Sequence, residues 1–218
     1  MIVLIFGATG SAGGSVLRVC LADPDVTEVR VIVRRPTGLT DPKLRQIIHR
    51  DYLVYESDQA TFTGVDACFY CLGKSVGQVS GEGEYRMITY EFAMAAAQAL
   101  HHASPAAVFH YVSGGGTSRT SQFMWARVKA EAEGDLMFRF GAVCWRPGSI
   151  DGVASASEPF VYKLFRPLSR VLLQPFPSAY VKGRDLGRAM LVATRGGARK
   201  RIFENAEIRK LAKQYRDR

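Results

Sequence analysis

The stretch GATGSAGG, residues 7–14, decides the fold that we expect for this chain. It follows the apolar run Ile2–Phe6, which is typical of a buried strand, and it opens a segment with helical periodicity. Gly7 allows a tight turn, Gly10 lets a phosphate approach the backbone, and Gly13 lets helix and strand pack closely. Such a turn binds the diphosphate of a dinucleotide at the helix N-terminus. The predicted cofactor contacts here are Gly7, Thr9, Gly10, Ser11, Ala12 and Gly13.

Beyond this turn, strand-like and helix-like segments alternate along most of the 218 residues. Continuous apolar strands separated by helices predict a parallel sheet that is covered on both faces. Further strands are expected at 28–33, within 44–51, and at 66–72, 106–116 and 141–148, with helices at 15–23, about 84–101 and around 121–133. We therefore expect one doubly wound α/β domain over residues 1–218, a Rossmann fold with a mostly parallel sheet and a small C-terminal annex.

The segment 149–184 interrupts this alternation and forms most of the expected annex, together with a C-terminal helix. Prolines and aromatic residues dominate its centre, which is too apolar for a disordered linker. Long loops at the carboxyl ends of parallel strands commonly carry substrate contacts. A lid or substrate wall is one interpretation of 149–184, and a subunit contact or surface packing is the other.

Composition limits the classes of protein that need to be considered. The hydrophobic fraction of 47% and charged fraction of 22% are ordinary for a globular domain. The N-terminus shows no targeting signal and no run is long enough to span a membrane, so we expect a cytoplasmic protein with no membrane contact. Cys68 and Cys71 lie three apart on an expected strand and point to opposite faces, which favours buried structural thiols.

The net charge of +9 is concentrated at the C-terminus. Residues 195–218 hold nine Lys and Arg against three acidic residues. Such a segment can bind nucleic acid. However, Ile208, Leu211, Ala212 and Tyr215 recur at helical spacing, which favours a helix packed on the body with a solvated basic face.

The second expected strand ends in Arg34 and Arg35, with no acidic residue nearby. A cofactor without a 2′-phosphate is usually held by an Asp or Glu at this place, whereas guanidinium groups suit a phosphate. We therefore predict NADP(H) rather than NAD(H), the alternative being two solvated arginines. Asp51, after the third strand, is expected either to accept from the adenine amino group or to be a surface acid.

Six motifs occur in an order that resembles a known family. They are GATGSAGG at 7–14, VRR at 33–35, CLGKS at 71–75, YVSGGG at 111–116, VKAEAE at 128–133 and RPG at 146–148. In this order they resemble the atypical short-chain dehydrogenases/reductases, particularly the small proteins similar to the Tat-interacting-protein oxidoreductases and the NmrA-like group.

The resemblance implies a role for each matching residue. Cys71, Leu72 and Gly73 would pass along the cofactor, and Ser113 would help to hold the substrate oxygen. Lys129 would bind the nicotinamide ribose, and Pro147 and Gly148 would flank the nicotinamide.

One position departs from the family. Trp125 stands four residues before Lys129, where the family carries a tyrosine that acts as the acid. Positions i and i+4 share a helix face, so Trp125 and Lys129 are expected side by side. With Ser113 they make up the catalytic set that the resemblance implies. An indole N–H donates a hydrogen bond but has no usable acidity in this range. Loss of a general acid typically costs about 10²–10⁴-fold in rate.

Other proton donors are open at this point. Water or a tyrosine of the annex, Tyr162 or Tyr180, is a candidate, whereas Tyr111 on the fifth strand is better explained as a core residue. The histidines show no catalytic spacing, and no metal-ligand cluster is expected.

Three functions are compatible with these observations. The first is an NADP(H)-dependent oxidoreductase on a small carbonyl or quinone-like acceptor. The second is a non-enzymatic NADP(H) sensor or scaffold that acts on a protein partner, and the third, which is disfavoured, is nucleic-acid binding. A monomer and a homodimer are both compatible with the sequence.

Overall fold

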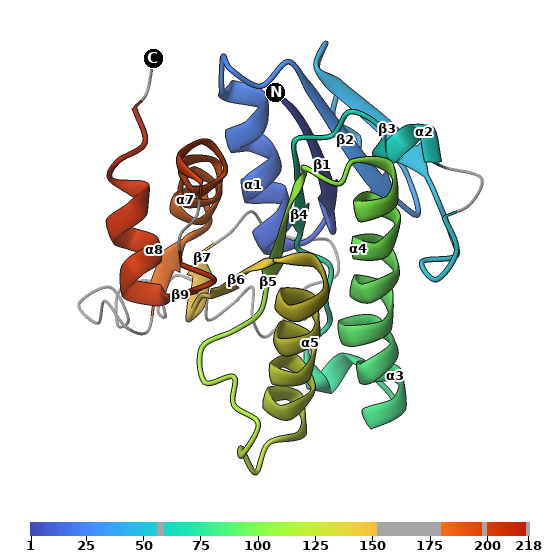
Figure 1. Ribbon diagram of the computed structural model, residues 1–218, viewed down its shortest axis with the longest axis vertical. Coiled ribbons are helices and arrows are strands. Elements are labelled where there is room, and N and C mark those ends of the chain that lie inside the picture. The colour runs from blue at the N-terminus through green and yellow to red at the C-terminus, as the bar shows by residue number, and fades with distance from the viewer. Residues whose placement is uncertain (56–58, 152–179, 198–199, 217–218) are drawn as a thin grey trace.

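The computed structural model describes residues 1–55, 59–151, 180–197 and 200–216. Its main sheet has seven parallel strands in the order β3-β2-β1-β4-β5-β6-β9 (Figure 1). The order reverses direction after β1, which has β2 on one side and β4 on the other. In open sheets of this kind the ligand crevice lies at this reversal, outside the carboxyl ends of the strands. The strands are β1 (Ile2–Phe6), β2 (Glu28–Val33), β3 (Leu44–Ile48), β4 (Ala67–Tyr70), β5 (Val108–Val112), β6 (Val143–Arg146) and β9 (Ile202–Glu204).

Helices cover both faces of this sheet. In Figure 1, α1, α7 and α8 lie on one side, and α4 and α5 lie on the other. The helical segments are α1 (Ser11–Ala22), α2 (Gln59–Phe62), η2 (Val76–Gln78), α3 (Glu82–Arg86), the π-helical turn η3 (Met87–Glu91), α4 (Phe92–Ala103), α5 (Met124–Phe140), α7 (Gly183–Gly196) and α8 (Asn205–Ala212).

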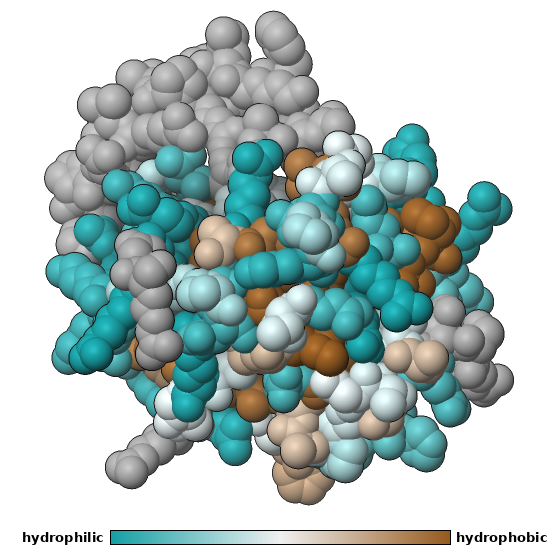
Figure 2. All heavy atoms as spheres, turned by 90° about the horizontal axis from the view of Figure 1, so that it is seen from above, coloured by the Kyte–Doolittle hydropathy of each residue, from teal (hydrophilic) through white to brown (hydrophobic). Residues whose placement is uncertain are grey.

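Two hydrophobic clusters form the core, one on each face of the sheet. The first packs residues of α1, α7 and α8 on the sheet, among them Leu17, Met190 and Ile208. The second packs residues of α4 and α5, among them Leu100 and Leu136. The inner strands β1, β2, β4, β5 and β6 are buried on both faces, as expected for a sheet covered on both sides, whereas the edge strands β3 and β9 are partly exposed. Figure 2 shows the surface seen from above, where most of the coloured side chains are hydrophilic and hydrophobic side chains appear in the gaps between them.

The sequence-based order of elements is confirmed, and the glycine turn is followed by α1 as expected. The opposite facing of Cys68 and Cys71 is confirmed: Cys68 is buried in the cluster under α4 and α5, whereas Cys71, just past β4, is partly buried against the cluster under α1 and α7. All four cysteines are free thiols.

The C-terminal part of the chain is more integrated than the sequence indicated. β9 extends the main sheet beside β6, and α8 packs against α7. Ile208 and Ala212 are buried, and the Tyr215 hydroxyl donates to Asp23, so the helix packs on the body as its spacing predicted.

The expected annex is described only at its two ends. There β7 (Ser149–Asp151) pairs with β8 (Tyr180–Lys182) as a small parallel sheet, and residues 152–179, including most of the expected lid, lie outside the described residues. None of the helices in the described ranges has the length and apolar character needed to cross a membrane.

Candidate dinucleotide-binding site

The glycine turn connects β1 to α1 with three close backbone approaches. Gly7 has φ of 73°, and its carbonyl accepts from the Gly10 N–H at 2.9 Å. A Cβ on Gly7 would lie 2.6 Å from the Cys71 carbonyl oxygen, and one on Gly13 would overlap the Gly7 carbonyl. Each position therefore needs glycine for a steric reason, which confirms the packing expected for Gly13. The first turn of α1 carries no acidic residue, so the helix N-terminus keeps its partial positive charge for an anion.

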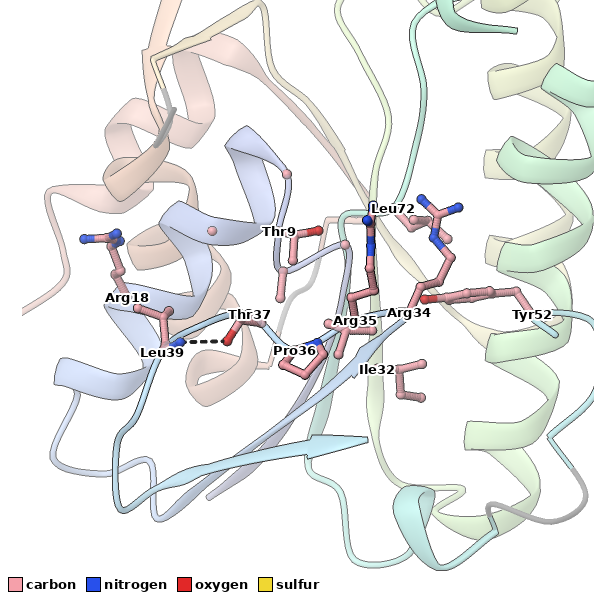
Figure 3. Close-up of a pocket in the computed structure, with 15 residues that line it drawn as sticks. Thr9, Arg18, Ile32, Arg34, Arg35, Pro36, Thr37, Leu39, Tyr52 and Leu72 are labelled. Carbon is pink, nitrogen blue, oxygen red and sulfur yellow. Dashed lines mark hydrogen bonds between the residues drawn. The ribbon is translucent and has the colours of Figure 1, made fainter. Parts of the chain in front are cut away.

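A cleft of about 580 Å³ opens beside this turn, between α1 and the end of β2. Its lining contains three guanidinium-bearing residues and no carboxylate among the described residues. Arg34 and Arg35 follow β2, and in Figure 3 their side chains point toward Leu72, at the end of β4. The lining residues are Gly7, Ala8, Thr9, Gly10, Gly14, Arg18, Ile32, Val33, Arg34, Arg35, Pro36, Thr37, Leu39, Tyr52 and Leu72.

Arg18 was not predicted as a site residue. It follows Gly10 and Gly14 at intervals of four, so helical spacing puts all three on the face of α1 that lines the cleft. Figure 3 shows its guanidinium pointing away from Arg34 and Arg35. That spacing was visible in the sequence, and it was the signal that would have found Arg18.

Tyr52, rather than its neighbour Asp51, lines the cleft. Tyr52 is buried and its ring stacks on Phe92, with centroids 5.6 Å apart. Burial raises the pKa of the Tyr52 hydroxyl, and the nearby Arg34 charge opposes that rise. The Asp51 carboxylate instead accepts from the Leu53 N–H at 3.0 Å within a turn, and Asp51 does not belong to the cleft lining.

A second group of predicted residues gathers where β5 ends and α5 begins. Lys129 Nζ donates to the Ser113 carbonyl at 2.9 Å, and its Cδ lies 4.0 Å from the place of a Cβ on Gly114. The Trp125 ring lies 3.6 Å from the place of a Cβ on Gly116. Trp125 and Lys129 thus face the same loop from one side of α5, as their spacing predicted.

The Ser113 hydroxyl takes part in a short hydrogen-bond chain. It lies 3.1 Å from the Thr117 hydroxyl, which donates to the Gly114 carbonyl at 2.8 Å. Since the Thr117 hydroxyl has one hydrogen, Ser113 is the donor in the first of these bonds. The chain orders the loop and orients Ser113 Oγ.

The turn formed by Pro147 and Gly148 is fixed by a residue that sequence reasoning missed. The Pro147 carbonyl accepts from Gly115 at 2.7 Å, and the Gly148 N–H donates to Asn205 Oδ1 at 2.8 Å. Asn205 is buried, and its amide also donates to the Tyr180 carbonyl at 2.8 Å. Asn205 lies 57 residues from Gly148 in the chain, so no local pattern signals it.

The candidate replacement acids among the described residues are engaged elsewhere. Tyr111 is buried and its hydroxyl donates to the Thr89 carbonyl at 3.1 Å, which confirms its interpretation as a core residue. Tyr180 is also buried, and its hydroxyl donates to the Asp151 carboxylate at 3.0 Å. Tyr162 lies outside the described residues.

The fold and the glycine turn define this chain as a Rossmann-type protein of the short-chain dehydrogenase/reductase class. Solved structures share the fold. A UDP-glucose 4-epimerase from Thermotoga maritima matches 98% of this chain and 82% of its own, with a TM-score of 0.69 and 15% identity. A short-chain dehydrogenase/reductase family oxidoreductase from Burkholderia thailandensis matches 88% and 85%, with a TM-score of 0.63 and 16% identity.

Proteins of similar sequence identify the family within this class. The mitochondrial protein fmp52 of Aspergillus clavatus is 30% identical over 169 residues, which cover 72% of this chain and 70% of that protein. Rat protein HTATIP2 is 25% identical over 223 residues, covering 97% of this chain and 89% of that protein. No family model matches the chain. The chain belongs to the Fmp52 and HTATIP2 family of atypical short-chain dehydrogenase/reductase-like proteins.

These relatives also correct one prediction. The expected cytoplasmic location is wrong, because the Fmp52 relatives from several fungi are named as mitochondrial proteins. The prediction rested on the lack of a recognisable leader in the first residues. Targeting signals are read by receptors and are separate from the packed fold, so a folded domain of this kind does not reveal its compartment.

Proposed function

We propose that this protein binds NADP(H) and transfers hydride between it and a small carbonyl or quinone-like acceptor. The single observation that carries the proposal is the cleft beside the glycine turn, where three arginines and no described carboxylate line the wall. Two guanidinium groups can bind the 2′-phosphate of NADP(H), whereas the ribose hydroxyls of NAD(H) are usually bound by a carboxylate at this place.

The proposed contacts run along the carboxyl ends of the strands. The N–H groups at the start of α1, with Gly7, Thr9, Gly10, Ser11, Ala12 and Gly13, would hold the diphosphate. Arg34 and Arg35 would hold the 2′-phosphate, and Tyr52 would form the wall beside the adenine. Cys71, Leu72 and Gly73 would pass along the middle of the cofactor, and Pro147 and Gly148 would flank the nicotinamide.

Reduced nicotinamide supplies a hydride when bound, and the chain's own residues would position the acceptor. The Ser113 hydroxyl would turn its hydrogen from Thr117 to the acceptor oxygen, and Lys129 would contact the ribose next to it. The loop that carries Ser113 is ordered by the Thr117 hydroxyl and packs against Trp125. Such positioning converts a bimolecular step into an effectively unimolecular one.

The experiment that tests the proposal is acceptor-dependent oxidation of NADPH. Purified protein is incubated with NADPH or NADH and a panel of aldehydes, ketones and quinones, and cofactor absorbance is followed. We expect oxidation that requires an acceptor and is faster with NADPH at low cofactor concentration. A panel in which no acceptor accelerates oxidation by either cofactor contradicts the proposal.

A second function is favoured by Trp125. Because the position of the family's acid holds an indole, the chain suits a protein that senses NADP(H) and acts on a protein partner. This candidate predicts tight NADPH binding without turnover and a partner interaction that changes with NADPH. A partner capture that is the same with and without NADPH excludes it.

The proposed compartment follows the relatives. Since several Fmp52 relatives are named as mitochondrial, we propose that this protein too acts in or on mitochondria. A fluorescent fusion that colocalises with a mitochondrial marker is the expected result, and diffuse cytosolic fluorescence contradicts it.

A further inference from the structure

We propose that the Lys129 ammonium group is the proton donor for carbonyl reduction in this protein, in place of the missing tyrosine. The inference rests on the proposed oxidoreductase function and goes beyond the ribose contact that Lys129 would make there. It assigns the acid to a residue that the structure already holds against Ser113.

The geometry puts the ammonium group beside the residue that would hold the acceptor. Lys129 Nζ donates to the backbone carbonyl of Ser113 at 2.9 Å, so the ammonium group contacts the residue whose side chain would hold the acceptor. An ammonium has three hydrogens, and this bond uses one of them. Trp125, one helical turn earlier, packs against Gly116 in the loop that follows Ser113, and its indole N–H is not acidic enough to supply the proton.

The carboxylate whose charge acts on Lys129 is paired with another cation. Glu133 stands one helical turn after Lys129 and is buried. Its carboxylate accepts from Arg146 Nε at 3.0 and 3.1 Å and from Arg146 Nη2 at 2.6 Å. Arg146 also donates to Glu204 at 3.0 Å. Arg146 of β6 therefore balances the negative charge of Glu133, and its bonds hold the Glu133 carboxylate away from a direct ion pair with Lys129 Nζ.

The surroundings favour release of a proton near neutral pH. Burial lowers the pKa of Lys129 to about 8, with Glu133 opposing the shift. Tyr111 on β5 and Cys144 on β6 also face Glu133, and burial raises the pKa of both, so neither ionises in this range. Ser113, Thr117 and Trp125, which face Lys129 from the loop and from α5, do not titrate. An acid whose pKa lies close to the working pH is the most effective proton donor.

The step balances in atoms and charge. The carbonyl carbon of the acceptor receives the hydride as NADPH is oxidised to NADP⁺, and the C=O π pair moves onto the oxygen. That oxygen takes a proton from Lys129 Nζ, which leaves an alcohol and a neutral amine. The amine regains its proton from water before the next turnover.

Two acceptors separate proton donation from cofactor binding. Hydride transfer to menadione gives a phenolate-type anion, whose conjugate acid has a pKa near that of tyrosine, about 10, and which needs no positioned acid. Hydride transfer to an aromatic aldehyde gives a far more basic alkoxide. A residue that only holds the cofactor affects both acceptors equally, whereas a proton donor affects the aldehyde selectively.

The test compares wild type, Lys129→Arg and the control Lys210→Arg, an exposed lysine of α8. Arginine keeps the positive charge and donor capacity but does not release its proton. With NADPH at saturating concentration, so that any change in cofactor affinity drops out, we expect Lys129→Arg to lower aldehyde reduction by about 10²–10⁴-fold more than it lowers menadione reduction. The wild-type aldehyde rate should fall about tenfold per pH unit above the pKa of Lys129, and Lys210→Arg should match wild type.

A second readout is independent of turnover. In NMR spectra of ¹³C-methylated protein, the lysine signal that is missing in Lys129→Arg should titrate near pH 8, well below the other lysines. Titration of that signal above pH 10, or equal losses with both acceptors in Lys129→Arg, overturns the proposal while the oxidoreductase function stands. If wild type binds NADPH but reduces neither acceptor, both the function and the assigned acid are overturned.

Discussion

Gly13→Ala is the substitution that best tests how the glycine turn is built. A Cβ at this position would lie 2.7 Å from the Gly7 carbonyl carbon and 3.1 Å from the Ala8 nitrogen. Both neighbours are backbone atoms, so α1 must move away from β1 to make room. Overpacking of this kind costs about 1–3 kcal/mol, and the better helix propensity of alanine offsets about 0.8–1 kcal/mol. Because the overlap is with the main-chain carbonyl of Gly7, the upper end of the overpacking range applies, and we expect a net loss of about 2 kcal/mol.

Gly134→Ala in the middle of α5 is the matched control. Its new Cβ would meet only the guanidinium end of Arg119, an exposed side chain that can swing aside. Here the propensity gain dominates, and stability should rise by about 0.5–1 kcal/mol. The same Gly-to-Ala change is thus predicted to have opposite signs in two helices.

The assay is thermal and chemical unfolding, followed by titration with NADPH. For a chain of this size, 1 kcal/mol corresponds to about 2–4 °C in Tm, so Gly13→Ala should lower Tm by about 4–8 °C and Gly134→Ala should raise it. NADPH affinity should fall about tenfold in Gly13→Ala, equivalent to about 1.4 kcal/mol, and stay constant in Gly134→Ala. If Gly13→Ala is as stable as wild type and binds NADPH equally well, the close approach of α1 to β1 does not shape the site.

Three other predictions concern the ends of the site and the core. Arg35→Ala should weaken NADPH binding by about 10–150-fold in equilibrium titration, the value of one charge-assisted hydrogen bond, and leave NADH affinity unchanged. Equal losses of affinity for the two cofactors contradict the assignment of Arg35 to the phosphate. His110 is buried, accepts from Trp145 Nε1 at 3.1 Å, and has a pKa that burial lowers to about 3. The unfolded chain therefore binds more protons than the native one below pH 6.5, and stability should fall by about 2 kcal/mol between pH 6.5 and 5 in urea titrations, a slope that His110→Phe should reduce. Asn205→Ala should destabilise the protein by about 1–3 kcal/mol and lower turnover, because the Gly148 N–H and the Tyr180 carbonyl both lose a partner; unchanged stability and turnover mean that Asn205 does not hold the turn.

The main architecture was predictable because its signals are local. The strand runs of β1 and β4 are apolar throughout, and β2 is apolar at four of its six positions. The glycine spacing at 7–14 has a steric meaning that does not depend on distant residues. The face shared by Trp125 and Lys129 follows from helical geometry alone. These elements therefore appear where the sequence placed them.

The rest depends on contacts between distant parts of the chain. β9 has only three residues and lies inside a basic segment, so its periodicity is too short to be recognised without β6 beside it. Asn205 reaches the Gly148 turn only because β9 and α8 fold back there. For Asp51 the sequence left an adenine contact and a surface acid open, and its exposed side chain fits the second, because it caps a turn that brings Tyr52 to the cleft instead. Arg18 is the exception, since its spacing was visible and was overlooked.

The central claim is that the cleft binds NADP(H), and one titration tests it most directly. NADPH and NADH are added separately to wild type and Trp125→Phe while tryptophan fluorescence is recorded; Trp145, the other tryptophan, is buried in the core. We predict that NADPH binds at least about tenfold more tightly than NADH, as expected for one phosphate contact, with a quench that is largely lost in Trp125→Phe. Binding of neither nucleotide, or equal affinity for both, contradicts the account.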